Sequence, residues 1–495
     1  MKVKTLAAKL VGVVVAVFLA VFLTQCGGGG GGTTGDNTQP QTLSGTVAVG
    51  KPLANTPVYL KDKNGQVRST LTDANGRFSF DTTGLTPPFY LRTQGYGLFS
   101  YADQQSGTAN LTPLTTAVVA IANNGNADIY TVSPNQLNIS SAQNSLKEFL
   151  NPVLQRYGVQ NADFITTPFD ANAQGMDAVL DSILISVLSD GQTIEIKNPF
   201  TGDTIGTGTI ANGSVNVSDP ITTNEANALP QPVIHRKYFV YAEDNYDSPE
   251  VGPFMIDVVE GDNGQISVTI TATEGDTGDL YLIYGSGTKN GNEISFTVSV
   301  IMCTNTDPNG TGTATFTGTI YSNGNITGTF TNTLLSDGDT CEESGSNTYE
   351  GTWRASDVTS ATPVGVAGLY DVYATPYGGW PEQGPATLQV SHNGSSINVS
   401  ITAIDGDTGQ PFTRYGRGIV YGNYLIFRVP VIICNDTCIN GTCPPAEYAT
   451  FFGEYNSANN TITGVYGDGV PAGDYCRDPN NQNTKAIGTW RAVKK

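Results

Sequence analysis

Cysteine is the residue type whose spacing in this chain points most directly to chemistry. There are seven cysteines, and all but the first lie in the C-terminal part of the sequence, at Cys303, Cys341, Cys434, Cys438, Cys443 and Cys476. In an exported protein, such an even set predicts disulfides. The group from Cys434 to Cys443 also has the close spacing of a metal site, but no histidine lies near it. We therefore predict disulfides and no metal.

Acidic turns form a second set of candidate ligands, because Ca²⁺ prefers carboxylate and backbone oxygens. Asp276 lies in the segment 274–278, and Asp407 lies in the similar segment 405–409. Neither segment has a complete twelve-residue calcium loop with its final glutamate. Asp-Gly pairs are also favoured in hairpin turns. We expect turns at both places, with calcium binding as the alternative.

Arrangements typical of catalysis are scarce in this sequence. The chain has two histidines, His235 and His392, and neither belongs to a recognisable catalytic motif. Paired carboxylates hydrolyse glycosides in many enzymes, but 44 acidic residues make such pairs unavoidable. Tyr377 and Trp380 lie in a stretch rich in proline and glycine, where exposed rings could stack on sugars or contact a partner protein. We predict these two as candidate ligand contacts, with core packing at a strand edge as the alternative for Tyr377, and we predict no catalytic residue and no cofactor.

Composition limits the classes of function that remain. The formal net charge is −20, which opposes nucleic-acid binding because a polyanion is bound by basic surface. The length of 495 residues predicts several domains. Glycine occurs 58 times and proline 26 times, which favours strands, turns and linkers over long helices.

The first 25 residues have the form of an export signal. Three lysines precede an uninterrupted apolar run from Leu10 to Leu23, which is too short for a transmembrane helix. The run ends in Leu-Thr-Gln followed by Cys26 and six glycines. This pattern resembles the signal of bacterial lipoproteins, in which a leucine stands three residues before a cysteine that becomes acylated. A secretory signal with an incidental cysteine is the alternative.

The resemblance implies that residues 1–25 are removed and that Cys26 carries fatty acyl chains such as palmitate. Residues 26–41 are rich in glycine and are expected to act as a flexible tether. Gly27 follows the cysteine, where lipoproteins retained at the inner membrane have aspartate. We therefore expect a lipid-anchored protein of the bacterial cell envelope, at the outer membrane on its periplasmic or surface face.

Residues 42–97 show the alternation of a β-sandwich. Apolar residues alternate with polar ones in three short runs, and Asn-Gly turns stand at 64–65 and 75–76. The segment resembles the carboxypeptidase regulatory-like family of prealbumin-like sandwiches. That resemblance implies an accessory domain without an active site of its own.

Residues 98–190 change to helical periodicity. Apolar residues recur at helical spacing after Pro113, from Leu146 to Tyr157, and from Met176 to Leu184, which predicts a small helical region. Residues 191–234 contain short strand-like runs and a linker rich in proline, asparagine and threonine.

The C-terminal half is an internal duplication of residues 235–358 in residues 363–495. Residues 266–278 correspond to 397–409, and residues 351–355 correspond to 488–492. Each copy has about eight runs of period two, which predicts an antiparallel eight-strand domain, either a barrel or a sandwich. The whole chain is therefore expected to be multidomain and mainly β.

Trp353 and Trp490 stand at matching positions of the two copies, each in a Gly-Thr-Trp strand. These strands resemble those of lipocalin-like and avidin-like barrels, in which a tryptophan closes the floor around a ligand. The alternative is that both tryptophans are ordinary core residues.

The matched copies also predict how the cysteines pair. Cys303 and Cys341 correspond to Cys434 and Cys476, so each copy is expected to have one long bridge. Cys438 and Cys443 remain for a local bridge in the second copy.

These observations favour a non-catalytic binding or structural role at the cell surface, with surface glycans or envelope proteins as partners. A barrel that binds a small apolar ligand is the first alternative. A carbohydrate-active enzyme that uses paired carboxylates in a cleft is the second.

Overall fold

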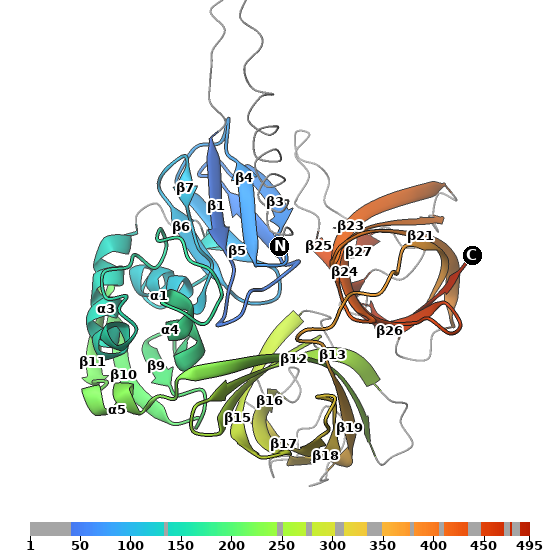
Figure 1. Ribbon diagram of the computed structural model, residues 1–495. Helices are drawn as coiled ribbons and strands as arrows, with labels where there is room; N and C mark the ends of the chain where they lie inside the picture. The colour runs from blue at the N-terminus through green and yellow to red at the C-terminus, as the bar shows by residue number, and fades with distance from the viewer. Residues whose placement is uncertain are drawn as a thin grey trace, which may run out of the picture. The chain divides into compact units, whose positions relative to one another are not determined.

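A computed structural model describes residues 41–132, 137–244, 251–273, 280–301, 311–333, 349–376, 381–404, 410–433, 447–469, 476–477 and 486–495. Strands dominate this part of the chain, and the helices are gathered in its first half (Figure 1). The predicted fold class is confirmed: a sandwich and a helical region precede two eight-strand antiparallel domains. Among the described residues, no helix is long and apolar enough to cross a membrane.

The first domain is a sandwich of two sheets, with strand orders β4-β1-β7 and β3-β2-β5-β6. Its strands are β1 (Thr42–Thr46), β2 (Pro57–Lys61), β3 (Val67–Leu71), β4 (Arg77–Asp81), β5 (Phe89–Thr93), β6 (Phe99–Ala102) and β7 (Gly107–Thr108). The predicted turn at Gly76 requires glycine, because φ is 74° and a Cβ there would lie 2.4 Å from the carbonyl oxygen of Val47. Strands β6 and β7 follow residue 97, so the sandwich also uses residues from the segment with helical periodicity.

The helices that follow are α1 (Pro113–Ala122), α2 (Ile129–Val132), α3 (Ile139–Arg156), α4 (Met176–Ser182) and α5 (Thr223–Ala228). Helix α1 begins at a capping box, in which Thr112 and Thr115 each accept a backbone N–H of the other. Four strands lie between α4 and α5 and form a sheet of order β11-β10-β9-β8. They are β8 (Leu184–Val187), β9 (Thr193–Lys197), β10 (Thr204–Ala211) and β11 (Ser214–Asp219).

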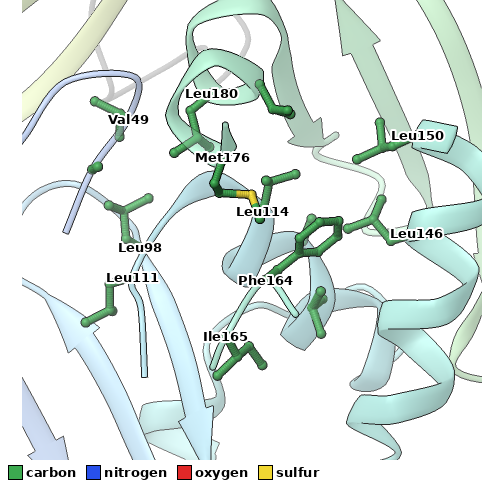
Figure 2. Packing of buried hydrophobic residues seen from close by; sticks show 14 of the residues in the cluster. Val49, Leu98, Leu111, Leu114, Leu146, Leu150, Phe164, Ile165, Met176 and Leu180 are labelled. Carbon is green, nitrogen blue, oxygen red and sulfur yellow. The ribbon is translucent and has the colours of Figure 1, made fainter. Parts of the chain in front are cut away.

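One hydrophobic core joins the sandwich to the helical region (Figure 2). Leu98 and Leu111 contribute from the sandwich side, and Leu114 of α1 lies beside Met176 of α4. Leu180 lies one turn after Met176 in the same cluster. The apolar residues of α4 are therefore buried in this core.

The third domain is a closed barrel of eight antiparallel strands. They are β12 (Pro232–Asp244), β13 (Val251–Gly261), β14 (Gln265–Thr273), β15 (Leu280–Asn290), β16 (Glu293–Ile301), β17 (Thr311–Ile320), β18 (Ile326–Thr333) and β19 (Tyr349–Asp357). The last strand returns to the first, with Tyr238 opposite Asp357 and Ala242 opposite Trp353. We call this domain barrel 1.

The fourth domain, barrel 2, has the same topology. Its strands are β20 (Gly368–Pro376), β21 (Gln383–Asn393), β22 (Ser396–Ile404), β23 (Pro411–Tyr421), β24 (Tyr424–Ile433), β25 (Glu447–Asn456), β26 (Thr461–Gly469) and β28 (Ala486–Lys494). Strand β28 pairs with both β20 and β26, and the pairing of β23 with β24 closes the ring. The short strand β27 (Cys476–Arg477) lies parallel to the end of β24, with Cys476 opposite Ile432.

An aromatic cluster fills the middle of barrel 1. Phe296 and Phe316 stack with ring centroids 5.0 Å apart, and the indole of Trp353 meets both rings edge-on. The indole N–H donates to the carbonyl oxygen of Thr317 over 2.9 Å. Gly318 makes room for this indole, because a Cβ there would lie 3.0 Å from the ring.

Barrel 2 repeats this cluster with equivalent residues. Phe427 and Phe451 stack at 4.8 Å, and Trp490 meets both rings edge-on. The indole N–H donates to the carbonyl oxygen of Phe452 over 2.8 Å, and a Cβ on Gly453 would lie 2.7 Å from the indole. The duplication in the sequence is therefore a duplication of closed barrels with the same core, and both tryptophans are core residues.

The outer faces of the two barrels contact each other. Phe239 of β12 stacks on Tyr424 of β24, with centroids 4.7 Å apart and rings 4° from parallel. The hydroxyl of Tyr241 donates to the Glu454 carboxylate over 2.7 Å. These contacts, together with Val465 of β26, form a separate buried cluster outside both barrel cores.

Candidate functional site

A cavity of about 420 Å³ lies where the sandwich, the helical region and barrel 1 meet, and we call it the junction cavity. Its walls come from the turn at residues 49–52, from helix α4 and from the outer face of strands β12 to β15. Tyr421 of barrel 2 also reaches it. Charged side chains line it in two groups, an acid pair on α4 and a lysine–aspartate bridge on barrel 1.

The acid pair consists of Asp177 and Asp181, one turn apart on α4. Their exposed fractions are only 1% and 5%. The backbone N–H of Ala173 donates to Oδ2 of Asp177 over 2.7 Å. Within the described part of the chain, Oδ1 of Asp177 and both carboxylate oxygens of Asp181 accept no hydrogen bond. Because burial of a polar group without a partner is costly, these oxygens are the most unusual feature of the cavity.

His235 faces the acid pair from the beginning of β12. Its Nε2 lies 3.3 Å from Oδ2 of Asp181, close enough for an ion pair when the ring is protonated. Burial opposes the charge on the ring, but the carboxylates of Asp181 and Asp177 outweigh it and raise the pKa of His235. The imidazole is therefore held toward its positive form beside Asp181.

Burial disfavours the charged form of the two carboxyl groups, so it raises their pKa values. It raises the pKa of Asp177 to about 7, and the neighbouring Asp181 contributes in the same direction. Burial also raises the pKa of Asp181, although His235 counteracts it. Asp177 thus changes its charge near neutral pH.

The lysine–aspartate bridge consists of Lys51, Asp257 and Lys237. Lys51 extends from the turn after β1 and binds Oδ2 of Asp257, which lies on β13. Lys237 of β12 binds Oδ1 of the same carboxylate over 2.7 Å. One aspartate therefore joins a lysine of the sandwich to a lysine of barrel 1.

Charges in this bridge shift one another's pKa values. Burial lowers the pKa of Lys51 to about 8, against the effect of Asp257. For Lys237 burial acts in the same direction, but Asp257 outweighs it and the pKa is raised. Burial would raise the pKa of Asp257, yet Lys237 and Lys51 together lower it. All three groups are therefore charged at neutral pH, and Asp257 is saturated by its two lysines.

The turn that carries Lys51 approaches α4 closely. Gly50 has a φ of 81°, and a Cβ there would lie 2.6 Å from Oδ1 of Asp181. Only glycine fits this position without moving the acid pair. The sandwich turn thus places both Lys51 and the backbone wall of the cavity.

The same outer surface has different surroundings in the two barrels. Tyr284 of barrel 1 lines the junction cavity, and burial raises its pKa. Its equivalent 131 residues later, Tyr415 of barrel 2, is 75% exposed. This tyrosine position is therefore covered in the first copy and exposed in the second.

Most residues that the sequence singles out lie outside the described residues. These are Cys26, Cys303, Cys341, Cys434, Cys438, Cys443, Tyr377, Trp380, Asp276 and Asp407. Only the backbone of Cys476 is described, in β27. The histidine that showed no motif in the sequence, His235, lies in the cavity. The described ranges contain no cluster of three or more His, Cys, Asp or Glu residues that could hold a metal.

Sequence reasoning missed Lys51, Asp177, Asp181, Lys237 and Asp257. The four-residue spacing of Asp177 and Asp181 places both on one side of a helix, and that signal was present. Nothing local indicates that both are buried, because the neighbouring domain buries them. Lys51 and Asp257 are 206 residues apart, so their pairing has no local signature.

Comparisons with known proteins give no family for this chain. No protein-family model matches it, and no curated protein matches it. Among solved structures, a Bacteroides fragilis crystal structure, provisionally described as that of an outer membrane protein, is similar over 53% of this chain and 97% of its own. The identity is 12% and the TM-score is 0.15. A TM-score this low carries no argument, so a function has to be inferred from the residues described above.

Proposed function

We propose that this protein is a lipid-anchored component of the bacterial cell envelope with a non-catalytic binding or structural role. The observation that carries the non-catalytic part is the repeated aromatic cluster, which places bulky side chains in the middle of both barrels. In this proposal the barrels are rigid modules, and their outer surfaces and rims contact partners.

One end of barrel 1 supports this view of a filled module. Arg236 pairs with Glu260 and with Asp357, each over 3.0 Å. Lys289 pairs with the same Glu260 over 2.7 Å. By strand register these side chains lie on the same face as the barrel core, at the end where β12 begins. A charged network at this end makes entry of an apolar ligand unfavourable.

Contacts between domains support a role in which several modules act as one body. The side chain of Asn55 in the sandwich donates to the carbonyl oxygen of Arg417 in barrel 2 over 3.0 Å. Gln94 exchanges two hydrogen bonds with the backbone of Tyr448, at 3.1 Å and 3.0 Å. Together with the lysine–aspartate bridge, these contacts tie both barrels to the N-terminal domains.

The anchor is proposed from the sequence around Cys26. The test is metabolic labelling of expressing cells with an alkyne analogue of palmitate, followed by membrane fractionation. We expect label and membrane association for the wild type and for Thr24→Ala, and neither for Cys26→Ala. An unlabelled wild type in the soluble fraction would contradict the anchor.

The non-catalytic role is tested separately. Titration with the apolar probe N-phenyl-1-naphthylamine is expected to leave the fluorescence of Trp353 and Trp490 unchanged, because their surroundings are occupied. A panel of chromogenic glycosides is expected to remain intact. Hydrolysis by the wild type that is lost in Asp177→Asn would overturn the proposal and favour the carbohydrate-active alternative.

Binding partners are tested on a glycan array and by cross-linking in the envelope. The wild type is expected to retain a glycan or an envelope protein that Trp380→Ala loses. Equal retention by the variant would remove Trp380 and Tyr377 as contacts.

A further inference from the structure

Part of the acid pair has no hydrogen-bond donor among the described residues of the cavity. Oδ1 of Asp177 is buried and accepts no hydrogen bond from any described residue. The lysines across the cavity do not serve it, because Lys51 and Lys237 are both bound to Asp257. His235 forms its close contact with Oδ2 of Asp181, 3.3 Å away. Asp177 thus lines the cavity with one carboxylate oxygen that has no described donor.

The volume and the walls of the cavity limit the kind of molecule that could supply a donor. A volume of about 420 Å³ lies within the range of roughly 300–1,000 Å³ typical of small-molecule sites. Apolar side chains stand beside the carboxylates, among them Val49, Leu180, Leu184 and Pro199. This combination suits a short aliphatic chain that ends in a positive, hydrogen-donating group.

A metal ion fits the same oxygens less well. Calcium needs six to eight oxygen ligands, whereas Asp177 and Asp181 supply four carboxylate oxygens at most. No group of three or more metal-ligating side chains is found in the described ranges. An ammonium group needs only acceptors, and its N–H donors suit Oδ1 of Asp177 and Oδ1 of Asp181, which accept no hydrogen bond from a described residue.

From this geometry we propose that the junction cavity binds a small aliphatic primary amine, with its ammonium group at Asp177 and Asp181 and its chain along the apolar wall. This site goes beyond the proposed envelope role and does not depend on the lipid anchor. The bound ammonium stabilises the ionised form of Asp177, so binding releases a proton when the carboxyl group begins protonated.

The test is isothermal titration calorimetry of the full chain in detergent with n-pentylamine, and with n-pentanol as the neutral probe of equal length. We expect the amine to bind and the alcohol not to bind at millimolar concentration. Affinity for the amine is expected to fall at least about tenfold from about pH 8 to about pH 5, because Asp177 becomes protonated.

Variants separate a binding role from a structural one. Asp177→Asn is expected to lose at least about tenfold in affinity and to remove most of the pH dependence. Asp203→Asn removes the same charge at an exposed site and is expected to bind like the wild type. If Asp177→Asn does not fold, Asp181→Asn and the pH series of the wild type provide the same test.

The proposal is overturned if the wild type binds neither probe across this pH range, or binds both equally. It is also overturned if Asp177→Asn binds the amine as tightly as the wild type. None of these outcomes affects the acylation test of the proposed function, so the two proposals fail independently.

Discussion

The acid pair is the residue-scale feature that sets this molecule apart, because both carboxyl groups are buried one turn apart. Asp177, Asp181 and His235 all have raised pKa values. A group whose pKa is raised on folding stabilises the fold at low pH and loses that contribution as pH rises through the folded value. Asp177 therefore loses this contribution as pH rises from about 4 to about 7, whereas His235 loses its own contribution only above its usual value of 6.5.

Asp177→Asn is expected to raise the stability of the protein at about pH 8, since it removes a charge that is costly to bury. A pKa raised from 3.8 to about 7 corresponds to at most roughly 4 kcal/mol. At about pH 4 the wild type and the variant are expected to be nearly equal. Differential scanning calorimetry across this pH range measures the difference, with Asp203→Asn as the exposed control. A variant less stable than the wild type at both pH values would contradict this account.

At the scale of the elements, glycines decide whether the barrels close around their tryptophans. Gly328 stands opposite Trp353 on the neighbouring strand. A Cβ at Gly328 would lie 1.8 Å from the carbonyl oxygen of Thr317 and 2.7 Å from the indole nitrogen. The strands cannot separate without breaking the backbone hydrogen bonds between them, so a methyl group at position 328 would clash with its neighbours.

Gly328→Ala is therefore expected to destabilise barrel 1 by about 3 kcal/mol or more, at the upper end of the effect of overpacking. Gly365→Ala is the control, because a Cβ at Gly365 meets no atom within 4 Å. Urea unfolding followed by tryptophan fluorescence measures both variants. Equal midpoints for the two variants would show that the barrel adapts to the added methyl group.

Strand β27 bears on the predicted disulfides of the second copy. It pairs in parallel with β24, and Cys476 stands opposite Ile432, two residues before Cys434 in the sequence. Cys434 lies outside the described residues, so the bridge between Cys434 and Cys476 stays a prediction. Such a bridge closes a loop of about 40 residues and is expected to contribute roughly 3–4 kcal/mol.

Mass spectrometry of non-reduced peptides tests the pairing. We expect Cys303 linked to Cys341, Cys434 linked to Cys476, and Cys438 linked to Cys443. Free thiols at Cys434 and Cys476 in protein from the envelope would contradict the prediction.

The elements also show what the sequence could predict. Period-two alternation predicted about eight antiparallel strands in the first copy, and the repeated sequence predicted that barrel 2 would match. Closure could not be predicted, because the pairing of β12 with β19 joins residues more than 100 positions apart. The cavity was missed for the same reason, since Lys51, Asp177 and Asp257 come from three domains.

At the scale of the whole molecule, one carboxylate joins distant domains. Asp257 binds a lysine of the sandwich and a lysine of its own barrel. Removing one lysine leaves the carboxylate paired, whereas removing the carboxylate leaves two buried lysines without their shared counter-charge. The two kinds of substitution should therefore differ in their effect.

Asp257→Asn is expected to destabilise the protein by about 3–5 kcal/mol, the range for a buried pair broken on one side. Lys51→Met is expected to have a clearly smaller effect, because Lys237 still neutralises Asp257 and the methionine keeps the apolar stem. Chemical denaturation of both variants measures the order. A larger loss of stability in Lys51→Met would mean that the sandwich turn, and not the carboxylate, holds the sandwich and barrel 1 together.

The unequal surroundings of Tyr284 and Tyr415 have a consequence for how the two halves can change over generations. Any substitution at Tyr284 must still fit the walls of the junction cavity. The side chain of Tyr415 is 75% exposed, so a substitution there meets fewer neighbouring atoms. The position in barrel 1 is thus expected to tolerate fewer side chains than the equivalent position in barrel 2.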